Sequence, residues 1–158
     1  MSILVMGLGN LLMSDDGLGS RVISELERCF LPCEQVSLLD GGTLGLDLLP
    51  RLEGVDKLLI IDALQMGAEP GLVFRLEGDE VPRAFANKLS VHQMGLQDLL
   101  AVAELQGNLP SELVVIGAQS AAIEMVMELS PPVEASFSEV ISAVLAELES
   151  WGQPLRAA

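Results

Sequence analysis

The sequence is poor in the residues that build closed zinc sites and nucleophile-based active sites. Its 158 residues include two cysteines and a single histidine, His92. Cys29 and Cys33 lie four residues apart without the further Cys or His partners that a structural zinc site requires. We therefore expect both cysteines to be buried or half-buried thiols without a function. One histidine also makes a Ser/His/Asp or Cys/His nucleophile the least favoured catalytic arrangement.

Basic residues are scarce as well. The chain has eight Lys and Arg but 23 Asp and Glu, which gives a formal net charge of −15. No Lys or Arg occurs between Lys88 and Arg156. Such a surface repels nucleic acids and anionic membranes, so we expect neither as a partner. Two explanations of the acidic excess stay open, namely solubility for a chain that is half hydrophobic and steering toward a basic partner.

Long apolar runs are absent. No run approaches the ~20 residues that cross a bilayer, and residues 2–6 lack the basic start of a signal peptide. We therefore expect a cytoplasmic protein. Because the chain has no repeat or low-complexity linker and is long enough for one core, we expect one domain over residues 1–158.

Short apolar runs alternate with helical patterns along the chain. The alternation predicts an α/β fold built on a parallel sheet with right-handed crossovers. The run at residues 57–62 has four consecutive aliphatic residues, 58–61, and should be central and parallel, whereas the mixed run at 72–77 should lie at an edge. Residues 120–129 receive no assignment. The other expected strands are 3–6, 34–40 and 112–117, and the expected helices begin at 18 and cover 44–52, 95–105 and 133–151.

A glycine-rich stretch, residues 6–19, turns the first strand into the first helix. Its Gly7-Leu8-Gly9 matches the first half of a dinucleotide fingerprint, but Leu12 occupies the third glycine position and should obstruct close packing of the helix. Asp15 and Asp16 at the helix mouth would also repel a pyrophosphate. We therefore expect no organic cofactor, although a degenerate nucleotide-binding domain stays as a third alternative. Asp15 is expected to cap the helix.

Three ionisable residues follow strands or precede a helix in equivalent places. Asp16 comes just after the first strand, Asp62 ends the third, and His92 lies at the entrance to a later helix. Because parallel strands end at one rim, we expect these side chains to converge. Two carboxylates and an imidazole suit a first-row divalent metal with open coordination positions. Capping or loop-bonding roles are the simpler alternatives for Asp62 and His92.

A second turn ends the second strand at the same rim. It consists of Asp40, Gly41, Gly42 and Thr43. Its glycines permit close approach of another backbone or conformations that other residues avoid. We expect this turn to bind substrate and to carry specificity, and the alternative is an ordinary turn whose glycines serve folding.

Five sequence elements, taken in order, resemble the maturation endopeptidases of [NiFe] hydrogenases, and the resemblance runs along most of the chain. They are Gly7-Leu8-Gly9-Asn10-Leu11-Leu12 with Asp15-Asp16-Gly17-Leu18-Gly19, then Asp40-Gly41-Gly42-Thr43, then Asp62, His92, and Gly117-Ala118-Gln119.

The resemblance implies an enzyme that removes a C-terminal peptide from the precursor of a hydrogenase large subunit after nickel insertion. It implies a three-layer α/β/α sandwich of the phosphorylase/hydrolase-like kind, in which a twisted, mostly parallel sheet of about five strands carries helices on both faces. It also implies that Asp16, Asp62 and His92 are the catalytic and metal-binding residues. Since three ligands on an open rim would hold a metal weakly, the divalent metal is expected to be nickel supplied by the substrate. Metal-assisted and carboxylate-based (aspartyl) hydrolysis both stay open. A non-catalytic nickel-binding chaperone or sensor that uses the same ligands is the alternative function.

Overall fold

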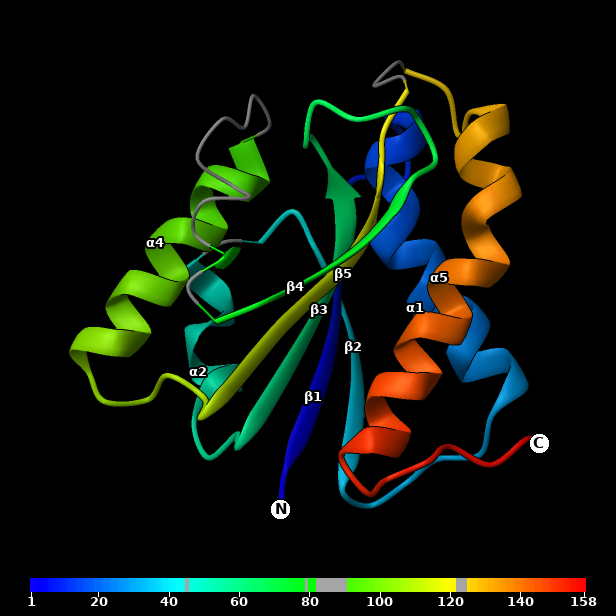
Figure 1. Cartoon of the computed structure of the whole chain (residues 1–158). Coiled ribbons are helices and arrows are strands. Elements are labelled where there is room, and N and C mark those ends of the chain that lie inside the picture. The colour runs from blue at the N-terminus through cyan, green and yellow to red at the C-terminus, as the bar shows by residue number, and fades with distance from the viewer. Residues whose placement is uncertain (45, 79, 82–90, 122–124) are drawn as a thin grey trace.

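The computed structural model describes residues 1–158 apart from 45, 79, 82–90 and 122–124, and the side chains of residues 91–97 are also outside the description. Strands and helices alternate along the chain (Figure 1). In order, the elements are β1 (Ile3–Leu8), η1 (Ser14–Gly17), α1 (Leu18–Cys29), β2 (Val36–Gly42), η2 (Leu46–Leu48), α2 (Leu49–Leu52), β3 (Lys57–Leu64), β4 (Val73–Glu77), α4 (Val91–Leu105), β5 (Glu112–Gln119) and α5 (Pro131–Ser150).

The five strands form one sheet in the order β2-β1-β3-β5-β4. β1 pairs in parallel with β2 and β3, and β3 pairs in parallel with β5. β4 is antiparallel to β5 at the edge. The mostly parallel sheet, the central position of the run at 57–62 and the edge position of the run at 72–77 are therefore confirmed.

Helices cover both faces of the sheet, as expected for a three-layer fold (Figure 1). Side chains of alternating positions enter opposite layers because the strand repeat is two residues. Ile61 packs in the layer with α1 and α5, whereas Ile60 packs in the layer with α2 and α4. Both side chains are fully buried. Whether a residue of β3 has an odd or an even number therefore tells which of the two helical layers its side chain faces.

The first helix lies unusually close to the sheet because glycines face each other. A Cβ on Gly19 would lie 2.3 Å from the carbonyl oxygen of Ile61, and one on Gly7 would lie 2.2 Å from the carbonyl oxygen of Gly19. Gly19 thus permits the close packing of helix on strand that a dinucleotide fingerprint would assign to a glycine at position 12. The expectation that Leu12 would obstruct packing is wrong, since its side chain is 58% exposed in the turn before η1.

Three further segments differ from expectation. β2 spans Val36–Gly42 instead of 34–40, because Gly42 pairs with Leu8 beyond a register shift in β1. α4 begins at Val91, so His92 belongs to the first helical turn and not to a preceding loop. The segment expected as a helix over 44–52 is a short η2 and α2 pair.

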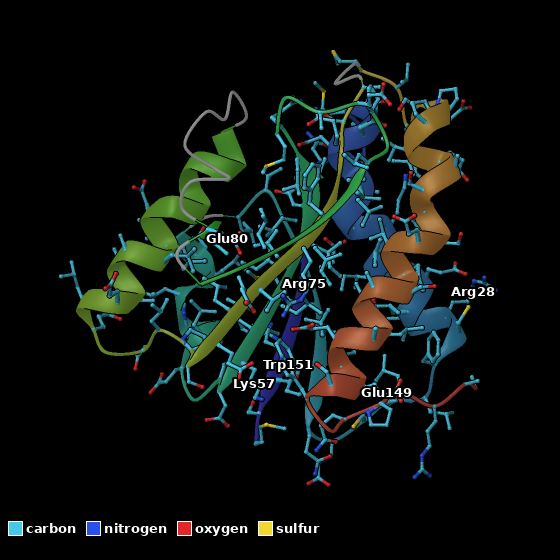
Figure 2. The ribbon with its side chains drawn as sticks, viewed as in Figure 1. Arg28, Lys57, Arg75, Glu80, Glu149 and Trp151 are labelled. Atoms are coloured by element: carbon cyan, nitrogen blue, oxygen red, sulfur yellow. The ribbon has the colours of Figure 1, made fainter. Side chains whose placement is uncertain are left out.

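Polar contacts attach α5 to the sheet. Arg75 of β4 donates from Nε to Oε2 of Glu147 at 3.0 Å and from Nη2 to Oε1 at 2.9 Å. The hydrogen bond to Glu147 is the main reason that the pKa of Arg75 is raised above its usual value. Just beyond the same end of α5, Nζ of Lys57 lies 5.4 Å from the centroid of the Trp151 ring (Figure 2). None of the described helices is both long and apolar enough to cross a bilayer.

Candidate functional site

The rim formed by the carboxyl ends of the parallel strands is the meeting place of most expected site residues. Figure 1 shows that α1, α4 and α5 all begin at this end of the sheet. Open α/β sheets bind ligands beyond the carboxyl ends of their strands. The rim is therefore the candidate functional site.

Asp16 lies in η1, directly before α1, and its side chain is almost fully buried. The backbone N–H of Asn10 donates to its Oδ2 at 3.2 Å. Gly9 makes this arrangement possible, since its φ is +126° and a Cβ there would lie 1.6 Å from the carbonyl oxygen of Asp16. No other residue type fits at Gly9 without moving η1.

Asp15, next to it, does not cap a helix as expected. η1 and α1 have no side-chain cap hydrogen bond. The fully buried Asp15 carboxylate instead accepts hydrogen bonds from the backbone N–H of Ala121 (2.7 Å) and from both the N–H (2.7 Å) and Oγ (2.8 Å) of Ser130. Ser130 precedes α5, so Asp15 joins η1 to the start of α5.

Ser14 strengthens the same junction. Its backbone has φ +52°, a left-handed conformation that non-glycine residues rarely adopt. Its N–H donates to the carbonyl oxygen of Val126 at 2.7 Å, and its Oγ donates to that of Glu128 at 2.8 Å. These bonds hold the strained residue, and with it η1, in place.

Asp62 is fully buried inside β3, which continues to Leu64, so it does not cap a helix. Its side chain faces the same side of the sheet as those of Ile60 and Leu64, which pack in the layer of α2 and α4. Its Oδ1 accepts a hydrogen bond from the N–H of Ala63 at 2.8 Å. A Cβ on Gly117 of β5 would lie 2.0 Å from its carbonyl oxygen, so the strand beside it must carry glycine.

His92 lies in the first turn of α4, the helix that covers the sheet face toward which Asp62 is directed. Its side chain is outside the described residues. Among the side chains that are described, no group of three His, Cys, Asp or Glu is placed to hold a metal, and that search does not include His92. The structure thus brings Asp16 and Asp62 to the same rim and places the α4 backbone at His92 on the matching face.

The turn of residues 40–43 adjoins this rim. Oδ1 of Asp40 accepts hydrogen bonds from Oγ of Ser20 (2.7 Å) and from the N–H of Gly42 (3.1 Å). The carbonyl oxygen of Gly42 accepts from the N–H of Gly9 at 2.8 Å. The two glycine-rich turns are therefore bonded directly to each other.

The two glycines of that turn face different ways. A Cβ on Gly41 would point into the core, 3.0 Å from Cδ2 of Leu8 and 3.3 Å from Cδ1 of Leu48, whereas one on Gly42 would meet nothing within 4 Å. Gly42 also has φ +54°. Any approach of a ligand to this turn would therefore be over Gly42 and the exposed Thr43.

Gln119 at the end of β5 has a bonding role that its local sequence does not reveal. Its Oε1 accepts from the N–H of Met66 (2.6 Å) and its Nε2 donates to Oε1 of Gln65 (3.0 Å). The N–H of Gly71 donates to its carbonyl oxygen at 2.8 Å. Gln119 thus fixes the excursion between β3 and β4. The only available sequence signal was a buried strand ending in an amide side chain.

The cysteines match expectation, since Cys29 and Cys33 are both half-buried free thiols. Sγ of Cys29 donates to Oε1 of Glu25 at 3.3 Å. That hydrogen bond and burial raise the pKa of the Cys29 thiol. Both cysteines lie toward the end of the molecule opposite the rim, at the end of α1 and before β2.

Comparison with known proteins identifies the family. A family model described as hydrogenase maturation protease matches residues 20–147. The chain is 41% identical to the hydrogenase expression/formation protein HupD of Bradyrhizobium diazoefficiens over 95% of this chain and 79% of that protein. It is 38% identical to the hydrogenase 2 maturation protease of Escherichia coli over 96% and 93% of the two chains.

The fold agrees with this relationship. The solved structure of the hydrogenase maturating endopeptidase HybD from E. coli superimposes with a TM-score of 0.95 at 37% identity, covering 99% of this chain and 98% of that one. The α/β fold and the resemblance drawn from the five sequence elements are both confirmed. The chain therefore belongs to the [NiFe] hydrogenase maturation protease family, and it is an endopeptidase.

Proposed function

We propose that this protein removes a C-terminal peptide from the nickel-loaded precursor of a [NiFe] hydrogenase large subunit, and that Asp16, Asp62 and His92 grasp the nickel. The observation that supports the proposal is that two buried carboxylates, Asp16 in η1 and Asp62 in β3, belong to the same rim of the sheet, at the end where α4 also begins. Buried ionisable groups without a packing role are typical of functional sites.

The donor set fits nickel brought by the substrate. Carboxylate oxygens and an imidazole nitrogen are ligands of first-row divalent metals. Two carboxylates that converge at one rim, Asp16 from η1 and Asp62 from β3, would repel each other, and the divalent charge that the loaded precursor carries would reduce that repulsion. Recognition of the precursor would then depend on whether nickel has been inserted.

The surrounding backbone would keep the two carboxylates in position for hydrolysis. The N–H of Asn10 orients Asp16, and the N–H of Ala63 orients Asp62. In a carboxylate-based reaction, one of these groups accepts the proton of the attacking water. In a metal-assisted reaction, nickel in the substrate supplies Lewis acidity and the carboxylates hold the substrate beside the scissile bond. Both routes use the same residues.

The turn of residues 40–43 is proposed to bind substrate next to this site. Its bond to Gly9 places it beside the backbone that shapes the Asp16 loop. Gly42 leaves open space for a passing backbone, and Thr43 and Asp40 are exposed. A bulky charged replacement, Thr43→Lys, should change the choice among precursors without changing stability, because an exposed turn side chain contributes little to folding.

The experiment that tests the proposed function compares nickel-loaded with nickel-free precursor. Each is incubated with the protein, and mass spectrometry follows the loss of a C-terminal peptide. We expect a mass loss from the loaded precursor only. Nickel-dependent binding without any mass loss would instead favour the chaperone or sensor alternative.

A further inference from the structure

A groove lies between α1 and α5, on the sheet face opposite α4. Its volume is about 390 Å³, which is in the range of ligand-binding pockets. Its walls combine apolar and charged side chains. The apolar ones are Leu11, Met127, Leu129 and Phe137, and the polar ones are Arg21, Arg28, Glu25, Glu134 and Ser24.

Arg21 is the unusual member of this groove. It is half-buried, and its Nε is covered by protein yet has no hydrogen-bond acceptor among the residues that the structure describes. None of the ion pairs among the described residues involves Arg21. Arg28, seven residues further along α1 and also in the lining of the groove, is by contrast paired with Glu25 at 2.6 Å. A guanidinium that lines a groove without an internal acceptor is prepared to bind a carboxylate from outside.

The apolar wall continues onto the surface. Met127 is 60% exposed and Leu11 38%, and the neighbouring Met125 and Val126 are exposed as well. Met residues adapt to irregular apolar partners, and contiguous exposed apolar surface typically marks an interaction site. Ser14 bonds to Val126 and Glu128, so the two loops that form this wall are fixed to each other.

The groove is connected to the candidate active site through one loop. Leu11 belongs to the segment between β1 and η1, and η1 carries Asp16. Leu11 also packs against the far end of η1, since a Cβ on Gly17 would lie 3.0 Å from its Cα. The groove therefore borders the loop that leads into η1 and Asp16.

We propose that this groove is a second docking site for the large-subunit precursor, and that it holds an apolar segment whose carboxylate binds Arg21. The inference rests on the proposed function. The occupant is the precursor rather than a second copy of this chain, because two copies would each bring a net charge of −15 to the contact. The contact supplies affinity away from the reacting bond, so it affects substrate binding more than the chemical step.

The test replaces Arg21 with Met, which keeps an apolar stem and removes the guanidinium. Arg51→Met is the matched control, because Arg51 is exposed on α2, outside the groove, and its loss changes the net charge equally. Binding of nickel-loaded precursor is measured by calorimetry in an Asp16→Asn background, and kcat and KM are measured in the otherwise unchanged enzyme.

We expect Arg21→Met to raise Kd and KM by about tenfold or more, as loss of a charge-assisted hydrogen bond does, with kcat nearly unchanged. Arg51→Met should leave all three unchanged. An adverse charge in the apolar wall, Met127→Asp, should likewise weaken binding.

If Arg21→Met binds the precursor as tightly as Arg51→Met, the docking site is overturned. A fall in self-association with unchanged precursor binding also overturns it. Failure of the wild-type protein to cleave any loaded precursor would instead overturn the proposed function, whatever the binding results.

Discussion

Asp15 is predicted to be the structural anchor of the site although it is not among the proposed catalytic residues. Its carboxylate is fully buried and accepts hydrogen bonds from the N–H of Ala121 and from the N–H and Oγ of Ser130. Hydrogen bonds to a charged group contribute roughly 1.5–3 kcal/mol each. Because neighbouring bonds are not additive, we expect Asp15→Ala to lower the free energy of unfolding by about 3–5 kcal/mol.

Asp15→Asn should cost roughly half as much, since an amide oxygen can still accept one or two of these bonds but carries no charge. Ser130→Ala is the matched control. It removes only the hydroxyl bond, keeps the charge and the backbone bonds, and should cost about 0.5–1.5 kcal/mol. Unfolding by urea, with the slope checked for constancy, measures all three.

The same variants should affect catalysis in the same order, because Asp15 fixes η1 and therefore the position of Asp16. Cleavage of nickel-loaded precursor by Asp15→Asn should be reduced while the protein is still folded. If Asp15→Asn unfolds at the wild-type urea concentration and cleaves at the wild-type rate, the three hydrogen bonds do not position the site and the reasoning is refuted.

Three further predictions concern the frame of the molecule. Gly19→Ala should lower stability by more than about 3 kcal/mol in urea unfolding, because its Cβ would overlap the β3 backbone, and a near-wild-type midpoint would show that α1 can shift. Glu147→Gln should lower stability by about 1–2 kcal/mol, a value reduced because Arg75 is nearly half exposed, and no change in the midpoint would show that this pair is neutral. Alkylation of Cys29 near roughly pH 8.5 should be slower than in the unfolded chain, since the raised pKa of the thiol lowers the thiolate fraction. Glu25→Gln should accelerate this alkylation, as followed by peptide-resolved mass spectrometry. An unchanged rate in Glu25→Gln would remove Glu25 as the cause.

The sheet could be predicted from the sequence because each central strand is a run of aliphatic residues with no polar alternation. The runs at 57–62 and 112–117 are buried on both faces, and only a parallel sheet between two helical layers buries such a strand. The polar alternation of residues 72–77 identified the edge for the same reason. Asp62 could be placed because a carboxylate that ends such a run must lie at the rim.

The contacts that fix the site could not be predicted in the same way. The partners of Asp15 lie 106 and 115 residues further along the chain, so a local rule for helix ends gave a capping role that is wrong. The error at Leu12 has a similar cause, because the glycine that allows close packing is Gly19, which faces the sheet only once α1 has formed. Helix periodicity also could not locate the first turn of α4, which begins at Val91.

The central claim is that the buried carboxylates at the rim carry the endopeptidase reaction. The most direct measurement is cleavage of nickel-loaded large-subunit precursor by Asp62→Asn, with its urea unfolding measured in parallel. The substitution nearly preserves volume and removes one anionic ligand, so the account predicts a folded protein that releases no C-terminal peptide. Wild-type release of the peptide by folded Asp62→Asn would contradict it.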